Sequence, residues 1–367
     1  MLNGFDIINK KYNKAVDSMK ANEKDILNLE ANYEGRRAFH GELHDHAATG
    51  GTSDGTRSLE HWCGAMEALK MDFAAILDHK QVKHMYHPKW ADGLFIGGTE
   101  PGTVITDADA EKQSMHYNMI FENAEPLMEL LNSFPEYNFT GGPEGHFDYP
   151  TFTRERFGEL IDAVFAKGGF FVHPHPKQLM NSNDPLQYVF RDGMGLEVFY
   201  EEIGGEKTKD NYKLWCDVLA LGKKIYATAG CDLHACCHDT ALTTIYAEEK
   251  RNRAYIKRLR EGDFVCGPLG IRMCIGNTRM GGTCEFGKEK LTVSVGDFHK
   301  SVFIPEHKYR IDILNDSRVV ASSEMSCAET SYFSIETESI AKFYRVEVFD
   351  VDRDLRIAIG NPIWNIN

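Results

Sequence analysis

The clearest candidate for chemistry in this sequence is the histidine pair His44 and His46. Residues two apart on an extended segment point to the same face, so these two imidazoles can hold one metal ion between them. The glycines at 50–51 predict a turn that brings Asp54 back toward the pair. We therefore expect a metal centre whose remaining ligands come from other parts of the chain.

Other histidines and carboxylates follow short apolar segments that are typical of buried strands. His79 lies just beyond the segment 71–77, and Glu100 directly follows the segment 93–99. Imidazole and carboxylate ligands without thiolate suit zinc, manganese or iron in a hydrolytic site better than a structural zinc cage. The complete set of candidate ligands is His44, His46, Asp54, His79, Glu100, His116, His173, Asp232 and His234.

The elements that would position these residues alternate between strand and helix over 36–272. Ser58 and Thr153 are predicted to cap two of the amphipathic helices. Because the polar residues follow strands, we expect an α/β barrel with its site at the carboxyl ends of the strands. Residues 1–35 predict an N-terminal helical arm. Short alternating segments over 273–367 predict an antiparallel β-sandwich domain.

The motifs of residues 36–272 resemble those of the PHP (polymerase and histidinol phosphatase) superfamily of metal-dependent phosphoesterases. This family usually has threonine at position 77 and serine at position 231, where this chain has Leu77 and Cys231, and neither difference removes a ligand. The matching motifs are His44-Asp45-His46 with Ser53-Asp54-Gly55, Leu77-Asp78-His79, Val172-His173-Pro174 and Cys231-Asp232-Leu233-His234.

The resemblance implies a distorted seven-stranded barrel and two or three divalent ions, which would be zinc, manganese or iron. It further implies hydrolysis by a water molecule that the metal ions bind and activate. The three ligand sets of the implied trinuclear site are His44, His46, Glu100 and Asp232; Glu100, His116 and His173; and Asp54, His79 and His234.

Residues beside these motifs are candidates for supporting roles. Asp78 precedes His79 and could orient a ligand through a hydrogen bond, or could simply end its strand in a turn. His175, Lys80 and Lys177 lie where a cationic side chain could contact a substrate phosphate, although each could equally be a solvated loop residue.

The composition of the chain limits the kinds of partner that we expect and indicates its cellular compartment. The formal net charge of -14 predicts no general affinity for nucleic acid or for an anionic membrane. Nine cysteines without a Cys-x-x-Cys spacing indicate reduced thiols rather than a disulfide framework. With no leader pattern and no apolar stretch long enough to span a bilayer, we expect a cytoplasmic protein. The sequence leaves the oligomeric state open.

The function that these observations favour is metal-dependent hydrolysis of a small soluble phosphate ester. An alternative is a hydrolase of carbamate or carboxylic esters, because 343–348 and 358–364 resemble the end of the CehA/McbA-like branch of the family, which includes carbaryl hydrolase. A second alternative is a non-catalytic, metal-containing binding protein whose sandwich domain recognises its partner.

Overall fold

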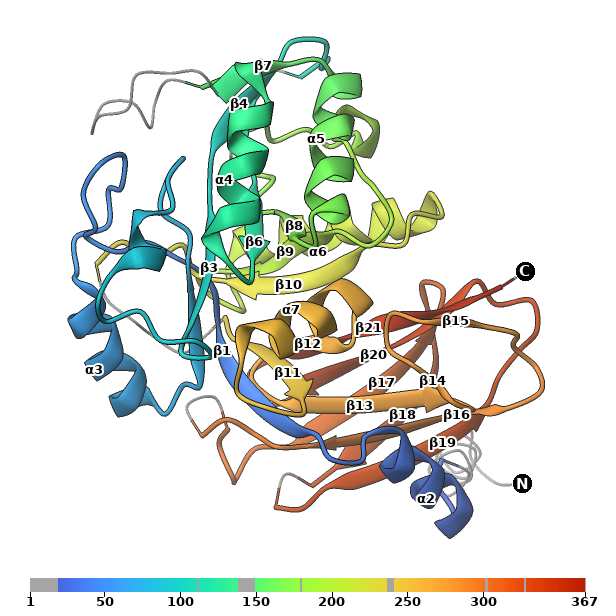
Figure 1. The fold of residues 1–367 in the computed structure, drawn as a ribbon. Helices are drawn as coiled ribbons and strands as arrows, with labels where there is room; N and C mark the ends of the chain where they lie inside the picture. The colour runs from blue at the N-terminus through green and yellow to red at the C-terminus, as the bar shows by residue number, and fades with distance from the viewer. Residues whose placement is uncertain are drawn as a thin grey trace, which may run out of the picture.

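A computed structural model describes residues 19–110, 112–137, 149–178, 180–235, 241–300, 303–326 and 328–366 of the chain. The fold is mixed α/β, with one large sheet, two smaller sheets and six α-helices within these ranges (Figure 1). Of the predicted N-terminal arm, residues 1–18 lie outside the described residues. The helices are α2 (Glu23–Asn32), α3 (Leu59–Leu69), α4 (Ala124–Ser133), α5 (Arg154–Ala166), α6 (Glu206–Ala220) and α7 (Asn252–Glu261).

Seven strands of the large sheet come from the first two thirds of the chain. The order is β10, β9, β8, β6, β3, β2, β1, and only β6 runs antiparallel to its neighbours. Beyond the end of β10, an isolated bridge pairs Asp45 with Leu233, so the first and last of these strands also meet. Their bounds are β1 (Arg37–Asp45), β2 (Phe73–Ile76), β3 (Phe95–Thr99), β6 (Asn118–Phe121), β8 (Phe170–His173), β9 (Gly195–Tyr200) and β10 (Tyr226–Gly230).

The same sheet continues from β1 into the C-terminal part of the chain. The predicted division at residues 272 and 273 falls inside β13 (Gly270–Ile275). The pairing of β12 (Phe264–Cys266) with β21 (Leu355–Asn365) continues the hydrogen bonding of the sheet across this division. The added strands are β11 (Thr243–Ala247), β12 (Phe264–Cys266), β21 (Leu355–Asn365), β20 (Phe343–Asp350), β17 (Tyr309–Asn315), β18 (Arg318–Met325) and, beside β21, β15 (Thr283–Cys284).

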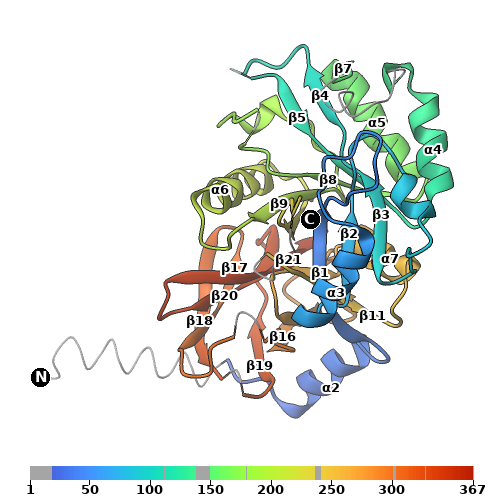
Figure 2. The same ribbon diagram turned by 90° about the vertical axis from the view of Figure 1, so that its left-hand side faces the viewer.

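Two smaller sheets complete the fold. The four-stranded sheet lies among the C-terminal strands, and the three-stranded sheet lies at the far end of the α/β part (Figures 1 and 2). The first contains β14 (Thr278–Arg279), β13 (Gly270–Ile275), β16 (Lys290–Gly296) and β19 (Ser331–Glu336), and the second contains β5 (Ser114–His116), β4 (Gly102–Ile105) and β7 (Thr151–Phe152).

The predicted caps are confirmed in two helices that cover the sheet. The Ser58 side chain accepts a hydrogen bond from the backbone N–H of His61, and Thr153 accepts one from Arg156. Each bond satisfies one of the otherwise unpaired N–H groups at a helix start. Trp62 of α3 is fully buried against apolar residues of β2. The caps and apolar faces thus hold α3 and α5 beside the strands whose ends carry the candidate site.

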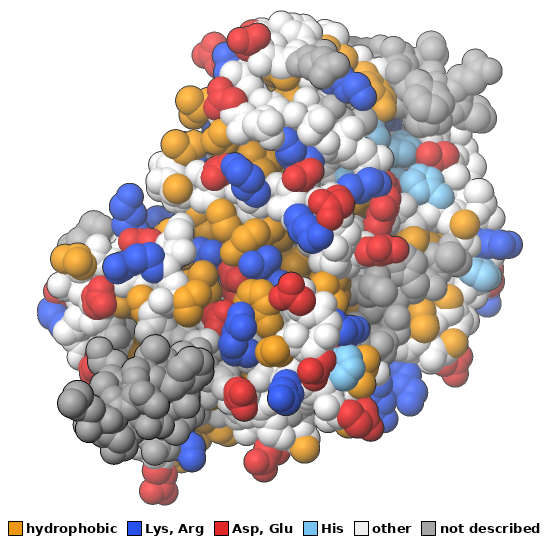
Figure 3. All heavy atoms as spheres, turned by 180° about the vertical axis from the view of Figure 1, so that it is seen from behind, with side chains coloured by type: hydrophobic (Ala, Val, Ile, Leu, Met, Phe, Trp, Pro, Cys, Tyr) orange, Lys and Arg blue, Asp and Glu red, His pale blue; other side chains and the backbone are white. Residues whose placement is uncertain are grey.

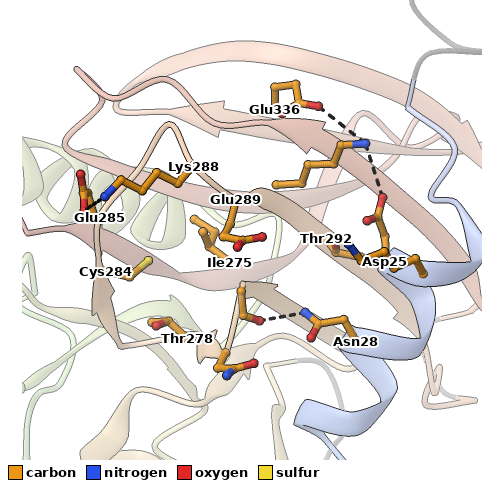
Figure 4. Close-up of a pocket in the computed structure, with 14 residues that line it drawn as sticks. Asp25, Asn28, Ile275, Thr278, Cys284, Glu285, Lys288, Glu289, Thr292 and Glu336 are labelled. Carbon is orange, nitrogen blue, oxygen red and sulfur yellow. Dashed lines mark hydrogen bonds and ion pairs between the residues drawn. The ribbon is translucent and has the colours of Figure 1, made fainter.

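Helix α2 packs beside β13 and β16, and a groove of about 630 Å³ opens between them (Figure 4). Its charged side chains pair with one another: Lys290 lies 3.6 Å from both Asp25 and Glu336, and Lys288 lies 2.6 Å from Glu285. The groove is therefore a largely self-neutralised polar surface. No helix within the described ranges is long and apolar enough to cross a bilayer.

Candidate metal centre

Imidazole and carboxylate groups meet where the strands of the α/β part end. Within each of three overlapping groups, the potential ligand atoms lie within 4.8 Å of one another. Polar side chains after neighbouring strands converge because the carboxyl ends of parallel strands share one edge. The three groups are His44, His46, Glu100 and Asp232; Glu100, His116 and His175; and His46, Asp54, His79 and His234.

Glu100 is the central residue, and it is fully buried. Its Oε2 lies 3.0 Å from His46 Nε2 and 3.2 Å from His44 Nε2. Its Oε1 lies 2.9 Å from His116 Nδ1 and 3.0 Å from His175 Nε2. One carboxylate therefore faces two groups of imidazoles, which is the arrangement of a ligand that bridges two ions.

Asp54 is the centre of the remaining group. Its Oδ1 lies 3.1 Å from His234 Nε2 and 3.4 Å from His79 Nε2. The turn that the glycines predict is present, since Gly50 and Gly51 both have positive φ, at 77° and 68°. The side chains of Asp54 and His234 are 34% and 35% exposed, so the centre is open to solvent on this side. Figure 3 shows histidine side chains, in pale blue, at the molecular surface.

Hydrogen bonds from outside the groups orient individual rings. His79 Nδ1 lies 2.6 Å from the backbone oxygen of Glu100, and His234 Nδ1 lies 2.9 Å from that of Asp232. A carbonyl oxygen only accepts, so Nδ1 of both rings carries a proton, and in the neutral form of each ring the lone pair lies on Nε2. Both Nε2 atoms face Asp54, as ligation of a shared ion requires.

The electrostatics favour positive charge. Burial alone would lower the pKa of His46, but the carboxylates of Asp232 and Glu100, each 3.0 Å from its Nε2, raise it to about 10. Burial would raise the pKa of the Asp54 carboxyl, but its neighbouring imidazoles, first among them His234, hold it well below its usual range. The Asp54 carboxylate thus stays ionised, and a divalent cation would be strongly attracted to it.

The buried polar atoms test whether these residues suit metal ions. Several lack a well-directed hydrogen bond although they lie close together, and leaving such atoms unsatisfied is costly. Ligation would satisfy them, and the donor set of imidazole and carboxylate is the one that divalent transition metals prefer. The residues therefore suit divalent metal ions. These atoms are His44 Nε2, His46 Nδ1 and Nε2, Asp54 Oδ1, Glu100 Oε2, His175 Nδ1 and Asp232 Oδ1.

His175, and not His173, completes the group around His116. The ring of His173 is buried among aromatic side chains, and its Nε2 donates to the backbone oxygen of Val189 at 2.9 Å. Burial lowers the pKa of His173 to about 4. His175, two residues further on, adopts a positive φ of 26°, and its ring points toward Glu100. The sequence analysis assigned His173 as the ligand and His175 as a substrate contact; in the structure His175 lies beside Glu100, and His173 lies among aromatic side chains.

Replacing each histidine separately tests which of the two binds a metal ion. We expect His175→Ala to lower the metal content per chain, and His173→Phe to retain it. The second change leaves the Val189 carbonyl without its donor, so it should reduce the free energy of unfolding by about 1–3 kcal/mol. Elemental analysis and urea denaturation measure the two effects. Loss of metal from His173→Phe, with full metal in His175→Ala, would restore the original assignment.

The side chain of Asp78, another predicted supporting residue, has its partners outside the three ligand groups. Asp78 accepts hydrogen bonds from the backbone N–H of Ala47, at 2.8 Å, and from the Thr49 hydroxyl. It therefore anchors the loop after His46 and does not orient the His79 ring. Lys80 is buried, with 8% of its surface exposed.

Lys177 holds a loop together. Its Nζ donates to the Ser182 backbone oxygen at 3.0 Å and to Asn183 Oδ1 at 2.8 Å. The Lys177 ammonium group is thus hydrogen-bonded within its own loop and does not contact the ligand groups.

Three further residues contact the groups from outside. Glu197 lies 3.1 Å from His44 Nδ1, the Tyr200 hydroxyl donates to Asp232 Oδ2 at 3.1 Å, and the Tyr149 hydroxyl lies 2.8 Å from His116 Nε2. The sequence analysis missed both tyrosines, because nothing in their spacing marks them. Glu197 and Tyr200 lie on β9, and only the folded sheet places that strand beside β10.

Comparison with known proteins finds similarity among solved structures. No protein-family model and no curated protein match the sequence. A two-domain protein from Bacteroides vulgatus, containing a predicted PHP-like metal-dependent phosphoesterase, has 13% identity and a TM-score of 0.43, over 90% of this chain and 96% of that one. Endonuclease Q from Pyrococcus furiosus has 12% identity and a TM-score of 0.44, over 61% of this chain and 56% of that one.

A third similar structure contains nucleic acid. It is Endonuclease Q in complex with a 27-mer duplex with an abasic lesion at the active site, with 10% identity and a TM-score of 0.41, over 61% of this chain and 57% of that one. The sequence analysis excluded nucleic acid as a partner from a net charge of -14. That exclusion does not hold, because a charge summed over a whole chain does not describe the field at one site.

Proposed function

We propose that this chain is a metal-dependent phosphoesterase of the PHP type. The single observation that carries the proposal is the position of Glu100, whose two oxygens face two groups of imidazoles in a buried, anionic centre. The resemblance of the sequence motifs supports the same assignment. The chain is accordingly a hydrolytic enzyme that acts on ester bonds.

The proposed cofactors are two or three divalent ions of zinc, manganese or iron. The ligand partition is the one implied by the sequence resemblance, with His175 in place of His173. We also propose the distorted seven-stranded barrel of this family for the strands β1, β2, β3, β6, β8, β9 and β10, with residues 36–272 as the catalytic part and 273–367 as a sandwich domain.

Divalent ions in such a centre supply Lewis acidity toward a phosphoryl oxygen and lower the pKa of water. The chain's own residues do the rest. Glu100 and Asp232 hold the histidines in fixed positions, and the carbonyl contacts of His79 and His234 at Nδ1 orient these rings with Nε2 toward Asp54. Substrate approaches from the exposed side, where Asp54 and His234 lie. The buried side excludes bulk water and so strengthens each of these electrostatic contacts.

A substrate panel tests the reaction class. We expect metal-loaded protein to release p-nitrophenol from p-nitrophenyl phosphate or from its bis-p-nitrophenyl diester, and chelator treatment to abolish the release. The Asp232→Asn variant is the control for a contaminating phosphatase, because it removes one negative ligand and should lose turnover. Release by this variant at the wild-type rate would contradict the proposal.

The same panel separates the alternatives. Cleavage of 1-naphthyl methylcarbamate, without cleavage of either phosphate, would assign the chain to the carbamate hydrolases that the C-terminal resemblance suggests. Cleavage of a DNA duplex with an abasic site would extend the substrate class to nucleic acid. Tight metal binding without turnover of any substrate would favour the second alternative, a non-catalytic, metal-containing binding protein.

A further inference from the structure

Glu197 lies on β9 directly behind the candidate metal centre, and only 2% of its surface is exposed. Its two oxygens have different partners. Oε1 lies 3.1 Å from His44 Nδ1, and Oε2 accepts a hydrogen bond from the backbone N–H of His175 at 2.9 Å. His44 and His175 belong to different ligand groups. The Glu197 carboxylate therefore contacts residues of both groups, as Glu100 does. On His44, Glu197 contacts Nδ1 and Glu100 contacts Nε2.

The local backbone leaves room for this carboxylate. In the pairing of β9 with β10, Glu197 lies opposite Thr228 and Phe199 lies opposite Ala229, so Val198 is an extra residue. Such a bulge changes the direction of the side chains beside it. A Cβ atom at Gly230 would collide with Glu197 Oε1 and would come within 2.6 Å of His44 Cβ. The close approach of Glu197 to His44 thus depends on glycine at position 230.

We infer that Glu197 is a positioning residue of the metal centre, and this inference rests on the proposed function. It accepts a hydrogen bond from His44 Nδ1–H, so the lone pair of the neutral ring lies on Nε2, which faces Glu100 and Asp232. It also holds the His175 backbone, whose positive φ turns the imidazole toward Glu100. Glu197 acts through these two histidines and touches neither substrate nor reacting atoms.

Both contacts need an acceptor, and only a carboxylate offers one on each side. In Glu197→Gln, one end of the side chain becomes an NH₂ donor. If the amide oxygen faces His44, the NH₂ group faces the N–H of His175, and two donors oppose each other. If the amide is reversed, the NH₂ group donates to His44 Nδ1, and the ring proton moves to Nε2, the atom needed for the metal.

The test measures metal affinity by chelator competition with Zn²⁺ and with Mn²⁺, in wild type, Glu197→Gln and Glu197→Asp. We expect Glu197→Gln to weaken affinity by about 10–100-fold, as removal of a hydrogen-bond partner of a metal ligand typically does. Its melting temperature without metal should stay close to that of the wild type, while the rise in melting temperature on adding metal should shrink. Glu197→Asp keeps both acceptors on a shorter side chain and should recover part of the affinity.

Glu201→Gln is the matched control. Glu201 follows β9, its side chain is 46% exposed, and its Oε1 accepts from Lys207 Nζ at 2.7 Å. This variant should bind metal as the wild type does. Wild-type affinity in Glu197→Gln, or an equal fall in melting temperature with and without metal, would overturn the inference and assign Glu197 a structural role alone. Absence of metal binding by the wild type would instead contradict the proposed function.

Discussion

Replacing Glu100 with glutamine is expected to remove most of the bound metal and all measurable turnover. The substitution keeps the volume of the side chain but removes the negative charge that five imidazoles surround within 3.6 Å. An amide also presents one donor where two acceptors are required. If the ions supply several kcal/mol of transition-state stabilisation, their loss lowers kcat by on the order of 10³-fold or more.

Metal content by elemental analysis and initial rates on p-nitrophenyl phosphate measure the two effects of Glu100→Gln together. The matched control is Glu201→Gln, which removes the same charge outside the ligand groups and should change neither quantity. Circular dichroism shows whether the variant remains folded. A folded Glu100→Gln protein with a full complement of metal and wild-type rate would contradict the central role of this residue.

Replacing Glu347 with glutamine is expected to have the largest effect on stability among the charged residues of the C-terminal strands. Glu347 on β20 is 2% exposed and lies 3.1 Å from Arg345 Nε and 2.7 Å from Arg356 Nε. Its Oε1 also accepts from the Tyr212 hydroxyl of α6 at 2.7 Å. Arg345 is itself 1% exposed, so the substitution leaves a buried cation without the carboxylate that it pairs with. Such a loss typically costs about 3–5 kcal/mol of unfolding free energy.

The pH dependence of the same variant gives a second measurement. Burial would raise the pKa of the Glu347 carboxyl, but Arg356 and then Arg345 outweigh it and hold the pKa below its ordinary value of 4.5. A carboxylate whose pKa is lower in the folded state stabilises the fold above the unfolded pKa, and this contribution is lost as pH falls through the folded pKa. The stability difference between wild type and Glu347→Gln should therefore be constant near pH 7 and narrow in acid.

Asp217→Asn is the control for Glu347→Gln, because Asp217 of α6 pairs with Lys213 on the surface and such exposed pairs contribute little. Its unfolding midpoint in urea should match that of the wild type. An unchanged midpoint for Glu347→Gln as well would mean that the contact between α6 and the C-terminal strands does not depend on this buried charge.

Much of the candidate centre could be predicted because its signals are local. The spacing of His44 and His46 and the position of Glu100 at the end of an apolar segment depend only on the period of a strand. The caps at Ser58 and Thr153 are equally local, and the structure confirms both. The sequence by itself therefore determined the mixed α/β class and eight of the nine residues that the three groups contain.

Only the tertiary structure decided the remaining features, because each depends on contacts between distant segments. Whether His173 or His175 faces Glu100 depends on one positive φ and on aromatic packing around the strand end. The two acceptor contacts of Glu197 exist because β9 lies beside β10, with its end near β1. The continuity of the sheet into the C-terminal strands comes from the pairing of β12 with β21. Strand order and ring orientation are set by long-range hydrogen bonds and packing, and a residue pattern along one segment does not contain them.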